Sequence, residues 1–229
     1  MDDATALITS AIPVEEEGTM SSFLGLAETP AGHGLPCSLT ADRGSHISTR
    51  RRPAARLPRM SSPEVGRALS QLGIDPIAAY SPEARGRSER AFRTLQDRLP
   101  KELGLAGISD DVEAANRFIR EVYLPAHNAR FAVAPSEAGS AFVSVEERQW
   151  RDILCIQEER VVAADNTVAW KRQRLQIPPH PARPHFVRAK VRVHEYPDGE
   201  IAIFHGPRCL VRWRPDQQEI TDDALRPAA

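Results

Sequence analysis

The hydrophobic pattern of this chain changes near residue 150, and this change constrains the fold more than any other feature of the sequence. Upstream of it, apolar β-branched runs alternate with amphipathic segments. Residues 4–14 predict a buried strand, residues 19–32 a helix and residues 35–40 a second strand. Because strand, helix and strand in this order are typical of a parallel βαβ unit, we expect an α/β layer architecture for the N-terminal part.

The alternation continues toward residue 131. The same periodicities predict further helices over 63–72, 87–99 and 111–124, the last ending before Pro125, and a short strand over 74–80. Residues 47–62 are rich in arginine and proline and follow neither period, so they predict an irregular insert. The Ala/Ser/Pro/Gly-rich stretch 132–151 predicts a linker.

Downstream of this linker the pattern is that of closely spaced strands. The expected strands are 153–160, 166–177, 186–196 and 200–213. Tyr196-Pro197-Asp198-Gly199 has the composition of a hairpin turn. We therefore expect a small all-β barrel over residues 152–215, followed by a tail over 216–229.

Length and composition set the broad class. The 229 residues suffice for one large or two small domains, and 41% of them are hydrophobic. No run of 18 apolar residues occurs and the chain begins Met1-Asp2-Asp3, so we expect neither a membrane span nor a secretory signal. Cys37, Cys155 and Cys209 stand singly, which predicts no zinc site and no disulfide framework, only small apolar strand residues in a cytoplasmic protein.

The net charge of −1 conceals an uneven distribution of charge along the chain. Residues 1–42 carry −7, residues 43–101 carry +8, residues 102–167 carry −6 and residues 168–229 carry +4. Of the 30 basic residues 27 are arginine, the side chain best suited to bidentate phosphate contacts. The two basic blocks are consistent with a polyanionic partner and equally with scattered solvated faces.

Two carboxylates stand where a parallel sheet builds its sites. Asp42 follows a predicted strand, and Glu89 lies on the first turn of a predicted helix. Together they could hold Mg²⁺ or Mn²⁺, with nearby arginines to attract phosphate. The alternative is structural, since Asp42 could cap a turn and Glu89 could pair with Arg93 at i,i+4.

Around these carboxylates the sequence resembles a known family. Ala41-Asp42-Arg43-Gly44-Ser45-His46 resembles the segment around the second carboxylate of the retroviral-integrase-like (DDE) transposases of insertion sequences. The run from Tyr80 to Leu95, Tyr-Ser-Pro-Glu-Ala-Arg-Gly-Arg-Ser-Glu-Arg-Ala-Phe-Arg-Thr-Leu, resembles their segment around the third carboxylate. The residues from Phe118 to Phe131 and the basic strands downstream also resemble this family, so the likeness covers about residues 1–46 and 63–215.

The resemblance implies a fold and a chemistry. Residues 1–131 would form part of a ribonuclease-H-like integrase catalytic core, and residues 152–215 a DNA-binding barrel. Asp42 and Glu89 would be catalytic metal ligands for Mg²⁺ or Mn²⁺ in phosphoryl transfer that integrates DNA. The expected DNA contacts are Tyr80, Arg85, Arg87, Arg90 and Arg93 in the core and Arg188, Lys190 and Arg192 in the barrel.

The chain also departs from the family pattern. The family's first catalytic Asp lies on a strand before the segment that matches Met1-Asp2-Asp3, so we expect an incomplete catalytic set and a transposase remnant that is inactive in strand transfer. Residues 47–62 do not resemble the family and suggest compensating frameshifts. The alternative function is a non-catalytic DNA-binding protein that modulates a full-length transposase. Either protein would bind double-stranded DNA at the nucleoid in the cytoplasm and would not bind a membrane. It would act as a homo-oligomer or together with full-length transposase.

Several other side chains have two interpretations. His46 could be a general base beside Asp42 or a turn residue, and His127-Asn128 could contact DNA or cap local structure. Four aromatic residues could stack on bases, although packing in a barrel core is favoured: Phe186, Tyr196, Trp170 and Trp213. Strand alternation predicts that Arg188, Lys190 and Arg192 share one face while the intervening Val187, Ala189, Val191 and Val193 face the core.

Overall fold

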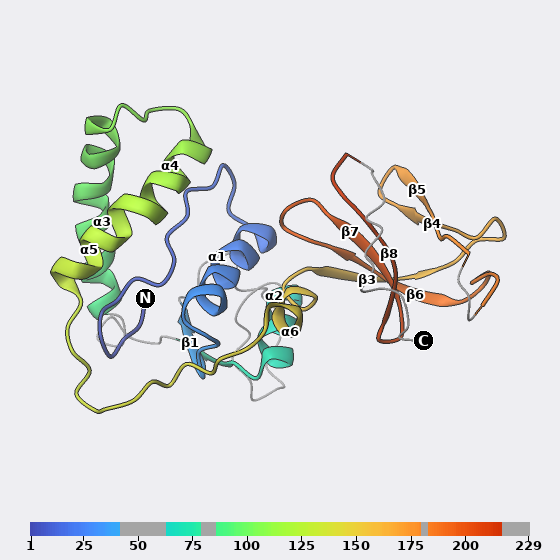
Figure 1. The fold of residues 1–229 in the computed structure, drawn as a ribbon, viewed down its shortest axis with the longest axis horizontal. Coiled ribbons are helices and arrows are strands. Elements are labelled where there is room, and N and C mark those ends of the chain that lie inside the picture. The colour runs from blue at the N-terminus through green and yellow to red at the C-terminus, as the bar shows by residue number, and fades with distance from the viewer. Residues whose placement is uncertain (42–62, 79–85, 180–182, 217–229) are drawn as a thin grey trace, which may run out of the picture. The chain divides into compact units, whose positions relative to one another are not determined.

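A computed structural model describes residues 1–41, 63–78, 86–179 and 183–216. The chain divides into two compact units, Met1–Leu154 and Cys155–Ala229, each with its own secondary structure (Figure 1). Asp42, His46, Tyr80, Arg85 and the predicted insert 47–62 lie outside the described residues. The predicted tail does so from residue 217 onward.

The first unit contains a parallel strand pair linked through a helix. Helix α1 spans Thr19–Gly32, strand β1 Ser38–Ala41, helix α2 Pro63–Leu72 and strand β2 Asp75–Ala78. The two strands pair in parallel with Ser38 opposite Asp75 and Ala41 opposite Ala78. Val65, Ala68 and Leu69 form the buried face of α2. The parallel connection expected from the sequence therefore runs through α2, not through α1.

The predicted strand over residues 4–14 is wrong, because these residues form no strand in the structure. They contribute buried Ile8 to the core, and their backbone carbonyls accept from helix side chains and from the backbone N–H groups of Asp2 and Val133. The Asn128 amide bonds both backbone groups of Ile8, accepting from its N–H at 2.9 Å and donating to its C=O at 3.0 Å. Asn116 donates to the Pro13 carbonyl at 3.0 Å. Apolar β-branched sequence favours an extended, buried backbone, but a strand also needs a neighbouring strand for its ladder.

In the first unit, α3 packs against a continuous run of helical turns (Figure 1). Helix α3 spans Gly86–Leu105, and α4 (Val112–Phe118), the π-helical turn η2 (Ile119–Tyr123) and α5 (Leu124–Phe131) run on continuously. Ile8, Ile119, Tyr123 and Leu124 form their buried cluster, against which Leu95 and Leu99 of α3 pack.

Both predicted helix ends in this region are wrong. The helix expected to end at Leu99 continues through Pro100, and that expected to end before Pro125 continues to Phe131. Pro125 stands in the first turn of α5, directly after the wider turn η2, which accommodates a residue without an N–H. Asp111 caps α4 by accepting from the Ala114 N–H at 2.8 Å. None of the helices in the described ranges is both long and apolar enough to cross a membrane.

The predicted linker is partly structured. Val143 forms an antiparallel bridge with Leu35, and a short helix, α6, spans Glu147–Arg151. Trp150 of α6 is buried, and the backbone carbonyl of Ile153 accepts from Arg67 of α2 at 3.1 Å. Much of the stretch 132–151 therefore packs with the first unit.

The second unit is antiparallel. Strands β3 (Ile156–Val161), β6 (Lys190–Glu195), β7 (Ile201–His205) and β8 (Arg208–Trp213) form one sheet in the order β3-β6-β7-β8. Strands β4 (Thr167–Trp170) and β5 (Gln173–Gln176) form a separate hairpin. The predicted turn at Tyr196–Gly199 is confirmed, with Gly199 at φ +84° in the left-handed region.

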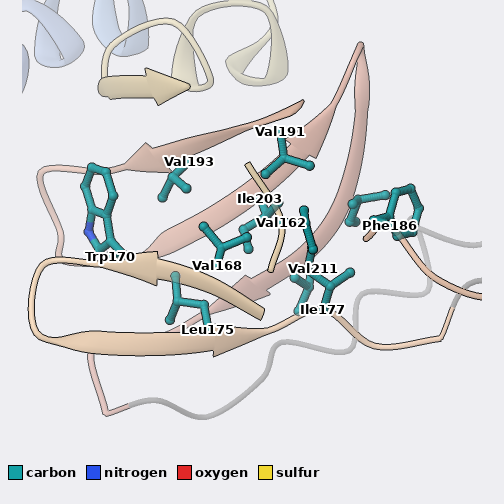
Figure 2. Packing of buried hydrophobic residues seen from close by; sticks show 11 residues of the cluster. Val162, Val168, Trp170, Leu175, Ile177, Phe186, Val191, Val193, Ile203 and Val211 are labelled. Carbon is teal, nitrogen blue, oxygen red and sulfur yellow. The ribbon is translucent and has the colours of Figure 1, made fainter. Parts of the chain in front are cut away.

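The hairpin and the sheet enclose a common core. Val168 and Leu175 from the hairpin point toward Val193 and Ile203 of the sheet, and Trp170 closes one end (Figure 2). Phe186 is also buried in this cluster, and Trp213 packs at its edge. Core packing, not base stacking, thus accounts for Trp170 and Phe186, as the sequence favoured.

Candidate nucleic-acid interface

In the first unit, the described residues of the predicted site are Arg87, Glu89, Arg90 and Arg93, all on α3. Arg87 and Arg90 line a cavity of about 320 Å³ between α3, α5 and residues 1–6, and Glu89 and Arg93 do not. At about 100° per residue, Glu89 projects about 100° from Arg90, with Arg93 between them. All four side chains are exposed. The structure therefore does not bring Glu89 together with Arg87 and Arg90 at one point.

Arg87 and Arg90 are oriented by the backbone. The Arg87 guanidinium donates to the backbone carbonyl of Asp3 and lies 3.6 Å from the Asp3 carboxylate. Arg90 donates from Nε to the Gly86 carbonyl at 3.1 Å. The neighbouring Asp2 has a structural role, since its carboxylate accepts from the Thr5 N–H at 3.1 Å and closes a turn.

An aromatic stripe runs along η2 and α5, and two of its members, His127 and Phe131, line the same cavity. Tyr123, His127 and Phe131 follow one another at i, i+4 and i+8, with ring centroids 5.6 Å and 4.7 Å apart. Arg98 of α3 and Arg130 of α5 each lie 5.4 Å from the Phe131 ring centroid. Such cation–π contacts hold guanidinium groups at a fixed position on the surface. The spacing was visible in the sequence, but the pairing with α3 was not.

Burial controls the titration of two members of this stripe. The pKa of His127 is lowered, first by burial and second by the charge of Arg98. The pKa of Tyr123 is raised, mainly by burial. His127 is therefore neutral near pH 7 and adds hydrogen-bonding capacity, not charge, to this region. Asn128 holds the backbone of Ile8, 120 residues away in sequence, which is a contact that the sequence did not predict for the His127-Asn128 pair.

In the second unit, the structure corrects the predicted basic face. Lys190 and Arg192 are exposed and alternate with buried Val191 and Val193, as predicted. Arg188 precedes β6 in a left-handed conformation at φ +61°, so strand alternation does not place it on their face. Its N–H donates to the Val162 carbonyl at 2.9 Å, which ties this turn to the end of β3.

Acidic and polar residues of β3 reduce the positive charge around Lys190 and Arg192. Glu159 pairs with Lys190 at 2.9 Å, and this hydrogen bond raises the pKa of Lys190. Glu159 also stands directly opposite Arg192 in the strand register, and Arg192 donates to Gln157 at 3.4 Å. The face is therefore mixed in charge, not uniformly basic.

The predicted metal site is only partly described. Across the residues that the structure covers, no three His, Cys, Asp or Glu side chains come together to hold a metal ion. Glu89 is exposed in the first turn of α3, and Asp42 is outside the described ranges. Within those ranges Glu89 is a single carboxylate and not a complete ligand set for Mg²⁺.

The cysteines fit their predicted structural role only in part. Cys155 is buried and Cys209 lies partly buried in β8. Cys37 is exposed just before β1, and its thiol lies 3.1 Å from the carbonyl oxygen of Ala141. The prediction of an apolar strand position for Cys37 is therefore wrong.

Comparison with known proteins relates the chain to transposases of insertion sequences. It is 31% identical over 228 residues, 98% of its length, to "Putative transposase y4bF" of Sinorhizobium fredii. It is 28% identical over 206 residues, 89% of its length, to "Transposase for insertion sequence IS1202" of Streptococcus pneumoniae. The chain spans about half the length of these relatives, 49% and 43% respectively. No family model matches the chain.

Proposed function

We propose that this chain binds double-stranded DNA and acts in the transposition of an insertion sequence. The observation that carries the proposal is its similarity, over nearly its whole length, to two proteins named as transposases. A transposase must hold DNA, and phosphate contacts from arginine and lysine supply most of the affinity of such binding.

The distribution of cations supports this proposal. Arg87, Arg90 and Arg93 lie exposed on α3, and Lys190 and Arg192 lie exposed on β6. Each set stands on a regular element, which fixes the spacing of the charges. Glu159 opposes the second set, so we assign the stronger phosphate contacts to α3.

We also propose that the first unit is part of a ribonuclease-H-like integrase core and that the second is a small DNA-binding barrel. The parallel pair β1 and β2 with α2 between them, together with the helices α1 and α3, supports the first assignment. The antiparallel sheet and the hairpin that share one core support the second.

For catalysis, we propose Glu89 and Asp42 as the carboxylates that would hold Mg²⁺ or Mn²⁺. The exposed position of Glu89 in the first turn of α3 leaves its carboxylate accessible from solvent. A bound divalent ion would supply positive charge to stabilise the phosphate group under attack. The arginines of α3 would hold the neighbouring DNA backbone.

The test combines DNA binding with DNA cleavage. The whole chain is mixed with end-labelled duplex DNA in Mg²⁺ or in EDTA, and both bound and nicked fractions are measured as salt is raised. Glu89→Gln is compared with Glu102→Gln, an exposed acid near the other end of the same helix. We expect salt-sensitive binding in every case. Any Mg²⁺-dependent nicking by the chain should be abolished by Glu89→Gln and preserved by Glu102→Gln.

The other outcomes are equally informative. Binding without nicking by any variant would favour the non-catalytic protein that modulates a full-length transposase. Nicking that persists in Glu89→Gln would contradict the role of Glu89. A folded chain that shows no salt-sensitive duplex binding would contradict the proposed function itself.

A further inference from the structure

The cavity beside the first turns of α3 has an unusual lining for its size. Its wall includes Arg87, Arg90 and Thr94 of α3, His127 and Phe131 of α5, and Asp3, Ala4 and Ala6. Its volume of about 320 Å³ is roughly ten times the ~30 Å³ that a water molecule takes up in the liquid. A phosphate group therefore fits within it. Among the described residues that line it, Asp3 is the acid.

The two arginines differ in how strongly they are already engaged. Arg87 is held by both the backbone carbonyl and the carboxylate of Asp3, so part of its charge is compensated. Arg90 is oriented through Nε by the Gly86 carbonyl at 3.1 Å, a contact that neutralises no charge. Arg90 is therefore the stronger candidate to bind an anion at the cavity mouth.

His127 of α5 lines the inner wall of this cavity. The residue is 7% exposed, and its Nδ1 is buried and does not face the cavity. The groups of the wall that can bind an anion are therefore the guanidinium groups of Arg87 and Arg90. Because burial lowers the pKa of His127, the ring is neutral near pH 7 and adds no positive charge to the cavity wall.

We infer that this cavity is a phosphate-binding pocket that takes one phosphodiester of bound DNA, with Arg90 as its main ligand. The inference rests on the proposed function and adds a defined contact to it. Arginine matches phosphate oxygens with paired N–H donors, which lysine cannot do in the same way. Arg93, one turn further along α3, is not among the residues that line this pocket.

Two variants test the pocket in different ways. Arg90→Gln removes the charge, whereas Thr94→Met keeps the charge and fills the cavity. Arg117→Gln, an exposed arginine on α4 that does not line this cavity, is the matched control. Duplex binding is measured over a range of salt, because each lost phosphate contact lowers the slope of log K against log salt by about one. We expect that loss for Arg90→Gln, a several-fold weaker affinity for Thr94→Met, and affinity within two-fold of the parent for Arg117→Gln.

A second measurement separates this inference from the proposed function. Inorganic phosphate is titrated into the whole ¹⁵N-labelled chain, and the Arg90 Nε–Hε resonance is followed by NMR. We expect a saturable shift that Thr94→Met abolishes and Arg117→Gln leaves intact. An Arg90 resonance that does not move, or variants in the pocket that bind DNA like Arg117→Gln, would overturn the inference. If the parent chain does not bind DNA but this resonance still shifts with phosphate, the proposed function is wrong and the phosphate pocket is still supported.

Discussion

Asn128 makes the most testable contact in the first unit. Its side-chain amide bonds the N–H and the C=O of Ile8 at 2.9 and 3.0 Å, as a neighbouring strand would. We predict that Asn128→Ala releases residues 4–14 from the helices without unfolding the second unit, which has a separate core.

The size of the effect follows from these two bonds. Each contributes about 0.5–1.5 kcal/mol net, so their loss costs about 2 kcal/mol. That free energy corresponds to about a 30-fold faster hydrogen exchange at the Ile8 amide if exchange follows local opening. The same loss lowers the melting temperature of the 154-residue first unit by about 4–8 °C.

The assay is hydrogen exchange of peptides from residues 1–14, together with thermal unfolding. Asn116→Ala is the matched comparison, because Asn116 makes one bond to this segment, at the Pro13 carbonyl, and its own Oδ1 is buried without a partner among the described residues. We expect its effect to be less than half that of Asn128→Ala. Equal exchange rates in Asn128→Ala and the parent chain would refute the assignment of Asn128 as the anchor of this segment.

Three further results are expected. Ile203→Ala, at a fully buried position between hairpin and sheet, should destabilise the second unit by about 2–5 kcal/mol in urea unfolding, and a loss below 1 kcal/mol would contradict the common core (Figure 2). Burial lowers the pKa of His127, so the folded state favours the neutral ring and protonation favours unfolding. The stability that the neutral ring contributes is present above the unfolded-state pKa of about 6.5 and is lost as pH falls through the folded-state pKa. Stability should therefore drop more between pH 7.5 and 5.0 in the parent than in His127→Gln, and equal drops would count against a buried neutral ring. Glu159→Gln removes the acid paired with Lys190, so it should tighten duplex binding a few-fold at low salt, whereas Glu137→Gln, an exposed acid in the predicted linker, should not; equal affinities for the two variants would exclude this face of β6 from DNA binding.

The errors of the sequence-based prediction have physical causes. Residues 4–14 have the composition of a strand, but ladder formation depends on a partner that the local pattern does not specify. Pro125 predicts a helix end because it lacks an N–H, yet the wider turn η2 before it lets the helix continue. Arg188 fits the strand alternation by number, but its left-handed backbone breaks that alternation.

The candidate site was predictable in its residues and only partly in its geometry. The basic run on α3 and the alternation of Lys190 and Arg192 are local patterns, and the structure keeps both. The pairing of Lys190 with Glu159 joins strands that lie some thirty residues apart, so no periodicity reveals it. The cavity between α3 and α5 depends in the same way on how two helices pack.

The sequence by itself determined those features of the fold that depend on residues close together in the chain. It gave α1 at 19–32 and α2 at 63–72 with the bounds observed, and the turn at Tyr196–Gly199, because helical periodicity and turn chemistry act over a few residues. The tertiary structure alone decided that Asn128 anchors Ile8 and that β1 pairs with β2. It also placed Arg87 and Arg90 on a cavity that Glu89 of the same helix does not line. These arrangements depend on contacts between residues far apart in the chain, whose free energies arise only when the packed faces meet.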